Sequence, residues 1–584
     1  MIFTFSGFRL DSARRELILR GREVVVQPKV FDLLEYLIEH RDRVSSKNEL
    51  MDALWPGTLV VEGALQRVVS LARSALHQGG QRQAIRTYSG RGYRFCIDVD
   101  AEEGTTTGRQ PSNSLDRARR AYRELDWDTA VKAYAEADRD NALPGADLVC
   151  AAQATQWCGH PSDAVELLER AIVAHQSQND RRGAANAAVW LAQIFFERMD
   201  TAIAAGWMRR AQRFLPPGDV SREQGLIRCL SSRIALLEGD LQKALTDADR
   251  TYEIGAELDD ADLEGLGLLY RGHAQLSLGS VDEGLGDQNE AAAAVLSSRV
   301  SPWAGALIYC GVIWTCRMRA DWERAAQWTG QFTRWCADKQ MSYYPGTCRL
   351  HRAEVLSVRG DTDEAERELH ESRGLLSRCA PWAEGDACRV LGDLRLARGD
   401  LAGAEEAYHQ ARELGWDPQP GYAMLLLERG EQDEAVRRLE AALDNPNWAN
   451  QEGRGRLLAH LLMAASRASQ RERAHQVLAE LEAGPWLRDT PAVIGTLERG
   501  RAELAYLELR LRDGIRHLRA AIDSWTRVGS PLNVAHLRLR QCRFLLESGD
   551  ADGAYIELDL AEKTFERQQA KPLLARCREL REAQ

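Results

Sequence analysis

The feature that most constrains this chain is a repeat of about forty residues, which begins near residue 115 and continues almost to the end. Between short polar turns, apolar residues recur at the spacing of one face of an α-helix. Because helices approach closely only where side chains are small, a small residue at a fixed position predicts a hairpin of two helices in each repeat. Such a residue stands four positions after nearly every turn, at Ala130, Ala164, Ala204, Ala244, Gly284, Ala325, Ala365, Ala404, Ala435, Ala474 and Ala554.

The repeats predict a mainly α-helical chain in which about twelve hairpins stack into a solenoid, since one hairpin cannot bury its apolar face alone. Only the repeat at Asp513 is out of register. The pattern resembles tetratricopeptide repeats, and the long period is similar to the variant found in the sensor halves of large bacterial regulators. Such arrays bind peptides, proteins or small-molecule effectors, so the resemblance leaves the ligand open. The other predicted turns contain Asp126, His160, Asp200, Asp240, Ser280, Asp321, Asp361, Asp400, Glu431, Gln470 and Asp550.

Aromatic residues are densest in the middle repeats, between residues 303 and 344. Rings on a concave surface would suit a peptide or an apolar effector. The alternative interpretation is that the rings fill the space between helices. Trp127 and Trp322 each directly follow a turn residue, which favours that structural role for both. The candidate effector-binding residues are Trp314, Trp335, Tyr343 and Tyr344.

The first 98 residues differ in charge from the rest of the chain. They contain 15 Lys and Arg against 11 Asp and Glu, whereas the whole chain has a formal charge of −11. The N-terminal segment is therefore basic, the remainder is acidic, and the basic segment is the candidate for binding nucleic acid. Its charge excess is modest, so the positive potential is expected to be local, and a homodimer or tandem sites would raise the affinity.

Within the basic segment, a stretch that begins at Glu62 and ends before Gly79-Gly80 is predicted to form an amphipathic helix. Leu65, Val69 and Leu76 recur at helical spacing and define a stripe that must be buried. The opposite face is small or polar and has no carboxylate, so it can lie against DNA. Arg can bond twice to guanine or a phosphate, and Gln can bond twice to adenine. The candidate major-groove contacts are Gln66, Arg67, Ser70, Arg73 and Ser74.

The next stretch, from Ile85 to Phe95, alternates like two strands joined by a turn at Ser89-Gly90. Its tip carries Arg91 between two glycines, with little side-chain bulk on either side. An Arg in this position can enter a minor groove, where the negative potential of DNA attracts it. Arg91 is therefore the candidate minor-groove contact.

These residues resemble the effector domain of the OmpR/PhoB-type winged-helix regulators, whose last hairpin ends in a Gly-x-Gly-Tyr-Arg-Phe signature. The sequence here is Gly90-Arg-Gly-Tyr-Arg-Phe95, and Glu49-Leu-Met-Asp-Ala-Leu-Trp-Pro56 matches the segment that ends the second helix of the family. The resemblance covers residues 1–97. It implies a winged helix-turn-helix that binds double-stranded DNA, with RNA polymerase as a further candidate partner. One departure is Leu71, where the family often has Arg or Lys for phosphate contacts.

The remaining N-terminal elements are predicted from local patterns. Residues 2–26 alternate apolar and polar side chains, which indicates a small antiparallel sheet. Pro28 opens a helix whose core face includes Phe31, and Ser46-Lys-Asn-Glu49 is a capping-box pattern for the next helix. With the helix described above they make a three-helix core, in which Phe31 and Trp55 are expected to be buried.

Three segments are predicted: a winged-helix domain at residues 1–98, a flexible linker at 99–114 rich in Gly, Thr, Ser and charge, and the array at 115–584. No apolar run approaches the roughly 18 residues that cross a bilayer, and no signal segment is seen, so a cytoplasmic location without a membrane partner is expected. Of the 12 scattered cysteines, only Cys310 and Cys316 are close enough in sequence to suggest a redox or metal site, and their spacing does not fit zinc.

The chain contains no phosphate-binding loop, zinc-binding His-Glu-x-x-His helix, dinucleotide turn or nucleophile elbow. No catalytic residue, cofactor or metal is therefore expected. The preferred interpretation is a bacterial-type transcriptional regulator whose array senses an effector or partner, or joins two copies. The alternative is an interaction scaffold in which the winged helix binds protein instead of DNA.

Overall fold

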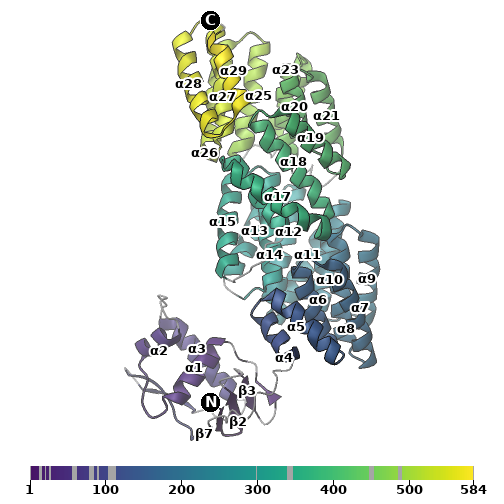
Figure 1. The fold of residues 1–584 in the computed structure, drawn as a ribbon, viewed down its shortest axis with the longest axis vertical. Coiled ribbons are helices and arrows are strands. Elements are labelled where there is room, and N and C mark those ends of the chain that lie inside the picture. The colour runs from purple at the N-terminus through teal and green to yellow at the C-terminus, as the bar shows by residue number, and fades with distance from the viewer. Residues whose placement is uncertain are drawn as a thin grey trace. The chain divides into compact units, whose positions relative to one another are not determined.

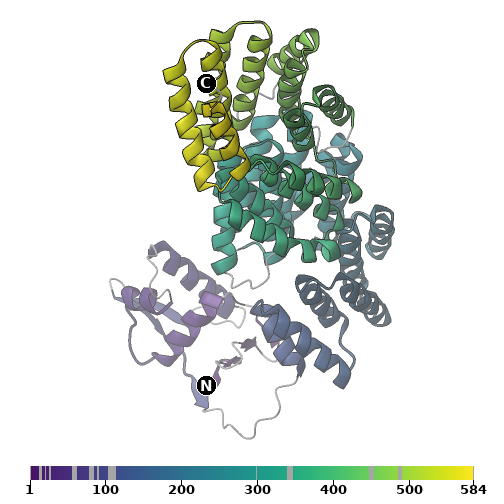
Figure 2. The same cartoon turned by 45° about the horizontal axis from the view of Figure 1, so that its top comes forward.

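The chain divides into two compact units, Met1–Ser112 and Asn113–Gln584. The first combines strands with three helices, and the described part of the second consists of helices (Figures 1 and 2). The predicted fold class, a small α+β domain followed by a helical array, is confirmed. The structure is a computed structural model that describes residues 2–582, with gaps at 12–15, 20–21, 25, 27, 55–61, 78–83, 89–90, 103–113, 297–298, 339–345, 446–452 and 485–489.

The N-terminal sheet has five antiparallel strands in the order β4-β3-β2-β1-β7. Its first four strands confirm the sheet predicted for residues 2–26. β7 pairs with β1 through Phe3 and Ala101, so the prediction that the linker begins at residue 99 is wrong. The last strand covers an edge of β1 that would otherwise expose unpaired backbone groups. The strands are β1 (Ile2–Phe5), β2 (Phe8–Asp11), β3 (Glu16–Leu19), β4 (Arg22–Glu23) and β7 (Asp100–Glu102).

Three helices and a two-stranded hairpin complete the N-terminal unit. Their apolar faces share one core with the sheet, in which Phe3, Phe31, Leu34, Leu65 and Phe95 are each at most 2% exposed. The burial of Phe31 confirms its predicted core position, whereas Trp55 lies outside the described residues. The elements are α1 (Pro28–Glu39), α2 (Lys47–Leu54), α3 (Glu62–His77), β5 (Ile85–Tyr88) and β6 (Gly92–Phe95).

The second unit is an array in which helices that follow one another in sequence pack side by side (Figure 1). The small residues predicted at the hairpin contacts have no exposed surface, as at Ala130, Ala244, Ala365 and Ala474. The array is therefore built as the repeats predicted. Its helices are α4 (Ser114–Arg123), α5 (Trp127–Asp140), α6 (Gly145–Trp157), α7 (Pro161–Ser177), α8 (Arg181–Glu197), α9 (Thr201–Phe214), α10 (Arg222–Glu238), α11 (Leu241–Leu258), α12 (Ala261–Leu278), α13 (Val281–Leu296), α14 (Pro302–Met318), α15 (Trp322–Asp338), α16 (Gly346–Arg359), α17 (Thr362–Cys379), α18 (Pro381–Ala397), α19 (Leu401–Glu413), α20 (Gly421–Arg429), α21 (Gln432–Asp444), α23 (Arg454–Arg467), α24 (Arg471–Ala483), α25 (Pro491–Leu507), α26 (Leu511–Val528), α27 (Pro531–Glu547), α28 (Ala551–Arg567) and α29 (Lys571–Glu582).

Each hairpin turn has one residue in the left-handed backbone region, directly before the residue that caps the second helix. Glycine occupies this position in several turns, as at Gly239 (φ 78°), because it has no Cβ to clash. Asp240 then caps α11 by accepting a hydrogen bond from the Lys243 N–H at 3.1 Å. Five turns place a residue with a side chain there, namely Leu125, Met199, Ala320, Ser469 and Leu509.

The repeat at Asp513 is in register once its turn is placed three residues earlier. Leu509 is the left-handed residue, Arg510 is the N-cap of α26, and the small residue four positions later is Gly514. A Cβ at Gly514 would lie 2.7 Å from a ring carbon of Phe544, so this repeat keeps its close helix contact. The sequence pattern missed the turn because Leu and Arg are not turn formers.

The array coils tightly enough that helices far apart in sequence touch. The Trp382 indole N–H donates to the Glu197 carbonyl oxygen at 3.1 Å, and the His536 Nε2–H donates to the Ala397 carbonyl oxygen at 2.8 Å. These contacts join residues separated by 185 and 139 positions. Consecutive turns of the superhelix therefore pack on each other and enclose space between them.

The turn geometry predicts opposite effects for two Gly to Ala substitutions. Gly239→Ala should destabilise the array by about 1 kcal/mol, because a Cβ strains the left-handed backbone although no atom lies within 4 Å of it. Gly374→Ala is the control, since this residue lies inside α17 with equally open surroundings, and should stabilise by about 0.5–1 kcal/mol. Thermal unfolding of the intact chain measures both, and shifts of the same sign would contradict the turn assignment.

Candidate nucleic-acid interface and array cavities

Helix α3 is divided into a buried stripe and an exposed polar face. Leu65, Val69, Ala72 and Leu76 are each at most 2% exposed, as their spacing predicted. Leu71, which stands where the resembling family often has a basic residue, packs partly buried against the same core. The exposed residues carry side chains that can bond to bases and phosphates, and they are Gln66, Arg67, Ser70 and Ser74.

Arg73 does not share the exposure of the other predicted contacts on α3. Its guanidinium donates to the Ile85 carbonyl oxygen at 3.1 and 2.8 Å and to the Thr87 hydroxyl at 2.8 Å. These bonds fix the hairpin to α3. These bonds give Arg73 a positioning role within the domain, and its role as a base contact stays a prediction.

The Gly-Tyr-Arg-Phe part of the signature holds the hairpin in place. A Cβ at Gly92 would lie only 1.9 Å from the Ser45 carbonyl oxygen, so only glycine fits where the strand crosses that loop. Tyr93 exchanges two backbone hydrogen bonds of 3.0 Å with Ser45, and the Arg94 Nε–H donates to the Arg41 carbonyl oxygen at 2.9 Å. Phe95 completes the core, edge-on to a ring of the N-terminal sheet.

Arg91 is the residue of the signature whose side chain is exposed at the hairpin tip. Its backbone N–H donates to the Tyr88 carbonyl oxygen at 2.9 Å, which helps to close the turn. Ser89 and Gly90, predicted at this turn, lie outside the described residues. Arg67 and Arg91 thus present guanidinium groups to solvent from the two elements that the winged-helix resemblance assigns to DNA.

The start of α2 is held by the predicted capping box. The Ser46 hydroxyl accepts from the Glu49 N–H at 3.2 Å, and the Ser46 N–H donates to the Glu49 carboxylate at 3.2 Å. Arg43 forms an ion pair with the Glu49 carboxylate at 2.6 Å, and the Tyr36 hydroxyl donates a hydrogen bond to the same carboxylate at 2.8 Å. The hydrogen bonds from Arg43, more than any other group, lower the pKa of Glu49 to about 2.

A three-helix core with a β-hairpin wing and an exposed third helix is a winged-helix domain, here in one chain with an array of helical hairpins. The family model described as "Transcriptional regulatory protein, C terminal" matches residues 21–95. The transcriptional regulator HilA of Salmonella typhi is 32% identical over 93 residues, which are 16% of this chain and 17% of HilA. The phosphate regulon protein PhoB of Escherichia coli K12 is 28% identical over 95 residues, which are 16% of this chain and 42% of PhoB.

The chain thus covers less than half the length of these relatives. Residues 21–95 form a DNA-binding domain of the OmpR/PhoB type, which confirms the resemblance. Among solved structures, a chain of the Cut9–Hcn1 hetero-tetramer aligns at 14% identity and a TM-score of 0.35. The alignment covers 79% of this chain and 95% of that chain. A Rap protein complexed with Competence and Sporulation Factor aligns at 12% identity and a TM-score of 0.34. The alignment covers 66% of this chain and 98% of the Rap chain.

One cavity of the array, lined by many aromatic residues, has a volume of about 490 Å³. Its walls come from helices as distant in sequence as α4 and α17, so no fixed spacing in the sequence could have indicated it. Many of its lining side chains are aromatic, including Tyr122, Trp127, Trp157, Trp190 and Trp303.

The predicted effector residues Trp314 and Trp335 do not line this cavity. Trp314 is 6% exposed and packs against Trp382 with ring centroids 6.2 Å apart, and Trp335 is 5% exposed and packs against Tyr309 at 5.8 Å. Both indoles fill space between helices, which is the alternative that the sequence allowed. The other two candidates, Tyr343 and Tyr344, lie outside the described residues.

The structure pairs Cys310 with Cys348, not with Cys316. The two sulfur atoms of Cys310 and Cys348 are 3.4 Å apart at the wall of the aromatic cavity, and His351 Nδ1 lies 3.5 Å from Cys310 Sγ. A hydrogen bond from Cys348 and the nearby His351 hold the pKa of Cys310 well below its usual range. Cys316 is buried in a separate apolar cluster.

Among the residues that the structure describes, no group of three or more His, Cys, Asp or Glu side chains is arranged to hold a metal ion. The same residues contain no helix that could span a membrane.

The low pKa of Glu49 predicts a pH-dependent contribution to the start of α2. Its carboxylate is ionised in the folded state down to about pH 2, so it stabilises the fold above the unfolded pKa near 4.5. That stability is lost as the pH falls from about 4.5 toward 2. Glu49→Gln should accelerate amide exchange in α2 at neutral pH, and the difference from the wild type should shrink as the pH is lowered. A difference that does not change with pH would contradict the ionic contribution.

Proposed function

We propose that this chain is a sequence-specific DNA-binding transcriptional regulator whose N-terminal unit binds promoter DNA. The observation that supports this most directly is the exposed, carboxylate-free face of α3, with Arg67 at its centre and Gln66, Ser70 and Ser74 around it. A helix of this kind fits the major groove, and guanidinium and amide groups read base edges there. Arg91 at the wing is the proposed minor-groove contact.

The array is proposed to decide when the DNA-binding unit acts. Its interior cavities offer sites for a peptide, a protein segment or a small molecule, and RNA polymerase is a further candidate partner of the chain. A ligand that favours one curvature of the superhelix, or one arrangement of two chains, would change the effective concentration of the DNA-binding units. The array thereby couples a cellular signal to promoter occupancy.

Removing single guanidinium groups tests the assigned DNA contacts. Arg67→Ala and Arg91→Ala should each weaken binding to a promoter fragment by about 1–3 kcal/mol, measured by titration after genome-wide mapping has identified a site. Arg9→Ala removes the same charge from β2, where Arg9 pairs with Asp11 at 3.6 Å, and should leave the affinity nearly unchanged. Equal losses in all three variants would indicate a general charge effect and contradict the assignment.

Salt dependence separates the proposal from the scaffold alternative. If the N-terminal unit binds DNA, the logarithm of the affinity should fall with the logarithm of salt concentration, with a slope of about −0.9 for each contacted phosphate. Arg67→Ala should reduce that slope by about one if Arg67 contacts a phosphate, and leave it unchanged if Arg67 reads a base. Failure to bind any genomic fragment at low salt, together with capture of a protein by residues of α3, would favour the scaffold.

A further inference from the structure

A second cavity, of about 220 Å³, is lined mainly by the first helices of consecutive hairpins in the C-terminal half of the array. These are α16, α18, α20, α23, α25 and α27, and a contact between α16 and α27 brings the two ends of this series together. Unlike the aromatic cavity, it is lined by many ionisable groups. The charged residues in its wall are Glu354, Asp393, Glu428, Arg456, Arg467 and Arg499.

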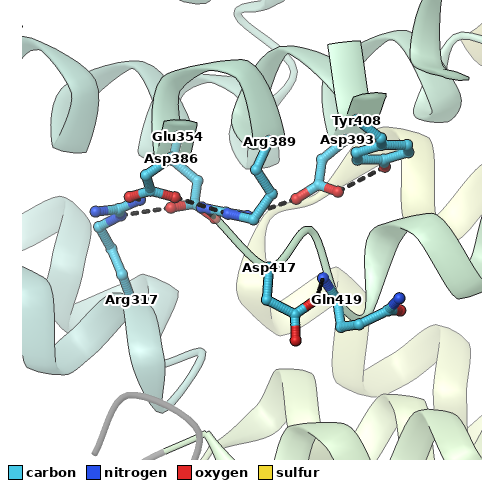
Figure 3. Close-up of polar contacts among 8 residues, drawn as sticks. All are labelled: Arg317, Glu354, Asp386, Arg389, Asp393, Tyr408, Asp417 and Gln419. Carbon is cyan, nitrogen blue, oxygen red and sulfur yellow. Dashed lines mark hydrogen bonds and ion pairs between the residues drawn. The ribbon is translucent and has the colours of Figure 1, made fainter. Parts of the chain in front are cut away.

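Two of the three carboxylates in this wall are already fully engaged by arginines and a tyrosine outside it (Figure 3). Glu354 accepts from Arg317 through one oxygen and from Arg389 at 3.0 Å through the other. Asp393 accepts from Arg389 at 2.6 Å and from the Tyr408 hydroxyl at 2.7 Å. Each oxygen of both carboxylates therefore already accepts a hydrogen bond from a residue outside the wall.

The third carboxylate is also shared. Glu428 accepts from Arg576 at 3.0 Å through one oxygen and from Arg467 at 3.5 Å through the other. Farther along α25, Glu503 is held by Arg540 at 2.9 and 2.5 Å. The acidic groups around the cavity are thus committed to other cations.

Arg456 and Arg499 are left without such partners. In the described residues neither guanidinium makes a hydrogen bond or ion pair, and the Arg499 Nε is buried with no acceptor. Burial, reinforced by neighbouring arginines, lowers the pKa of both side chains, although Glu354 and Asp393 attract Arg456, and Glu503 and Glu428 attract Arg499. His460 in the same wall adds no charge, because burial lowers its pKa to about 3.

The charge around the cavity does not balance. With Asp386, which bonds to Arg317 and Arg389 at 2.8 and 2.7 Å, and with the Glu503–Arg540 pair, five carboxylates face seven guanidinium groups: Arg317, Arg389, Arg456, Arg467, Arg499, Arg540 and Arg576. An excess of two positive charges remains. Burying cations without counter-charges is strongly unfavourable, so the arrangement is suited to an anion that enters from solution.

We infer that this cavity binds a small dianion bearing carboxylate or phosphate groups, held by Arg456 and Arg499 with support from Arg467. The planar guanidinium forks bond two oxygens at once, which suits both anion types. The volume of about 220 Å³ is that of about seven water molecules, which is enough for inorganic phosphate or a short dicarboxylate. The inference deepens the proposed sensing role of the array, since the anion would bridge the neighbouring hairpins that begin with α23 and α25.

Ligand-dependent stabilisation of the intact chain tests this site. Inorganic phosphate and succinate are each added to protein in a low-salt zwitterionic buffer, and thermal unfolding is compared with sodium chloride at the same ionic strength and with neutral glycerol. One or both anions should raise the Tm by about 2 °C or more beyond the chloride control. Phosphate alone points to a phosphate ligand and succinate alone to a dicarboxylate, whereas no rise with either overturns the inference.

Variants of the two arginines link the effect to the cavity. Arg456→Met and Arg499→Met keep the apolar stem and remove the charge, so each should raise the Tm without anion and abolish the anion-dependent rise. Arg389→Met is the matched control, because it strands Glu354, Asp386 and Asp393 and should lower the Tm. An anion-dependent rise in Tm that persists in both cavity variants overturns the inference. For any variant whose unfolding is not cooperative, calorimetric titration with phosphate measures binding directly.

This test can be read independently of the DNA-binding proposal. Arg67→Ala should lose promoter binding and keep the anion-dependent rise in Tm, while Arg499→Met should lose the rise. If the chain proved not to bind DNA, the anion-dependent change in Tm would still test the proposed anion site.

Discussion

Each hairpin of the array depends on the close approach of two helices at one small residue. Residues such as Ala244 have no exposed surface, and a larger side chain there would push the helices apart. The left-handed residue before each second helix sets the direction from which that helix returns. Repeated about twelve times, this local constraint determines the curvature of the superhelix, and everything in its interior follows from that curvature.

The curvature is high enough for the superhelix to contact itself, which sets this array apart from open solenoids whose repeats touch only their neighbours. The contact between Trp382 and Glu197 is one example. Charged side chains from the first helices of three neighbouring hairpins also meet inside the array, where Arg317, Glu354, Asp386 and Arg389 form a buried network (Figure 3). Such networks add little net stability because desolvation offsets attraction, and they are better suited to fixing one arrangement of the helices.

The N-terminal unit shows how one signature can serve two purposes. Gly92, Tyr93 and Arg94 hold the wing against the loop before α2, through a steric requirement and hydrogen bonds to Ser45 and Arg41. Arg91 precedes these three residues in the signature. Its side chain has no such structural role and is exposed to solvent. The same distinction applies on α3, where Arg67 is exposed and Arg73 is used to hold the hairpin.

The sequence by itself determined the two-part architecture, the hairpin register and the buried and exposed faces of α3, because these follow from the local spacing of apolar, small and turn residues. It could not separate Arg73 from Arg67, since both stand on a polar face and only packing decides which one meets Ile85. Nor could it pair Cys310 with Cys348 or bring Arg456 and Arg499 to one cavity. Each pair meets across two neighbouring hairpins, Cys310 and Cys348 on α14 and α16 and Arg456 and Arg499 on α23 and α25. Which side chains face each other there is decided by how the helices pack, because the spacing of apolar residues marks only the buried face of each helix.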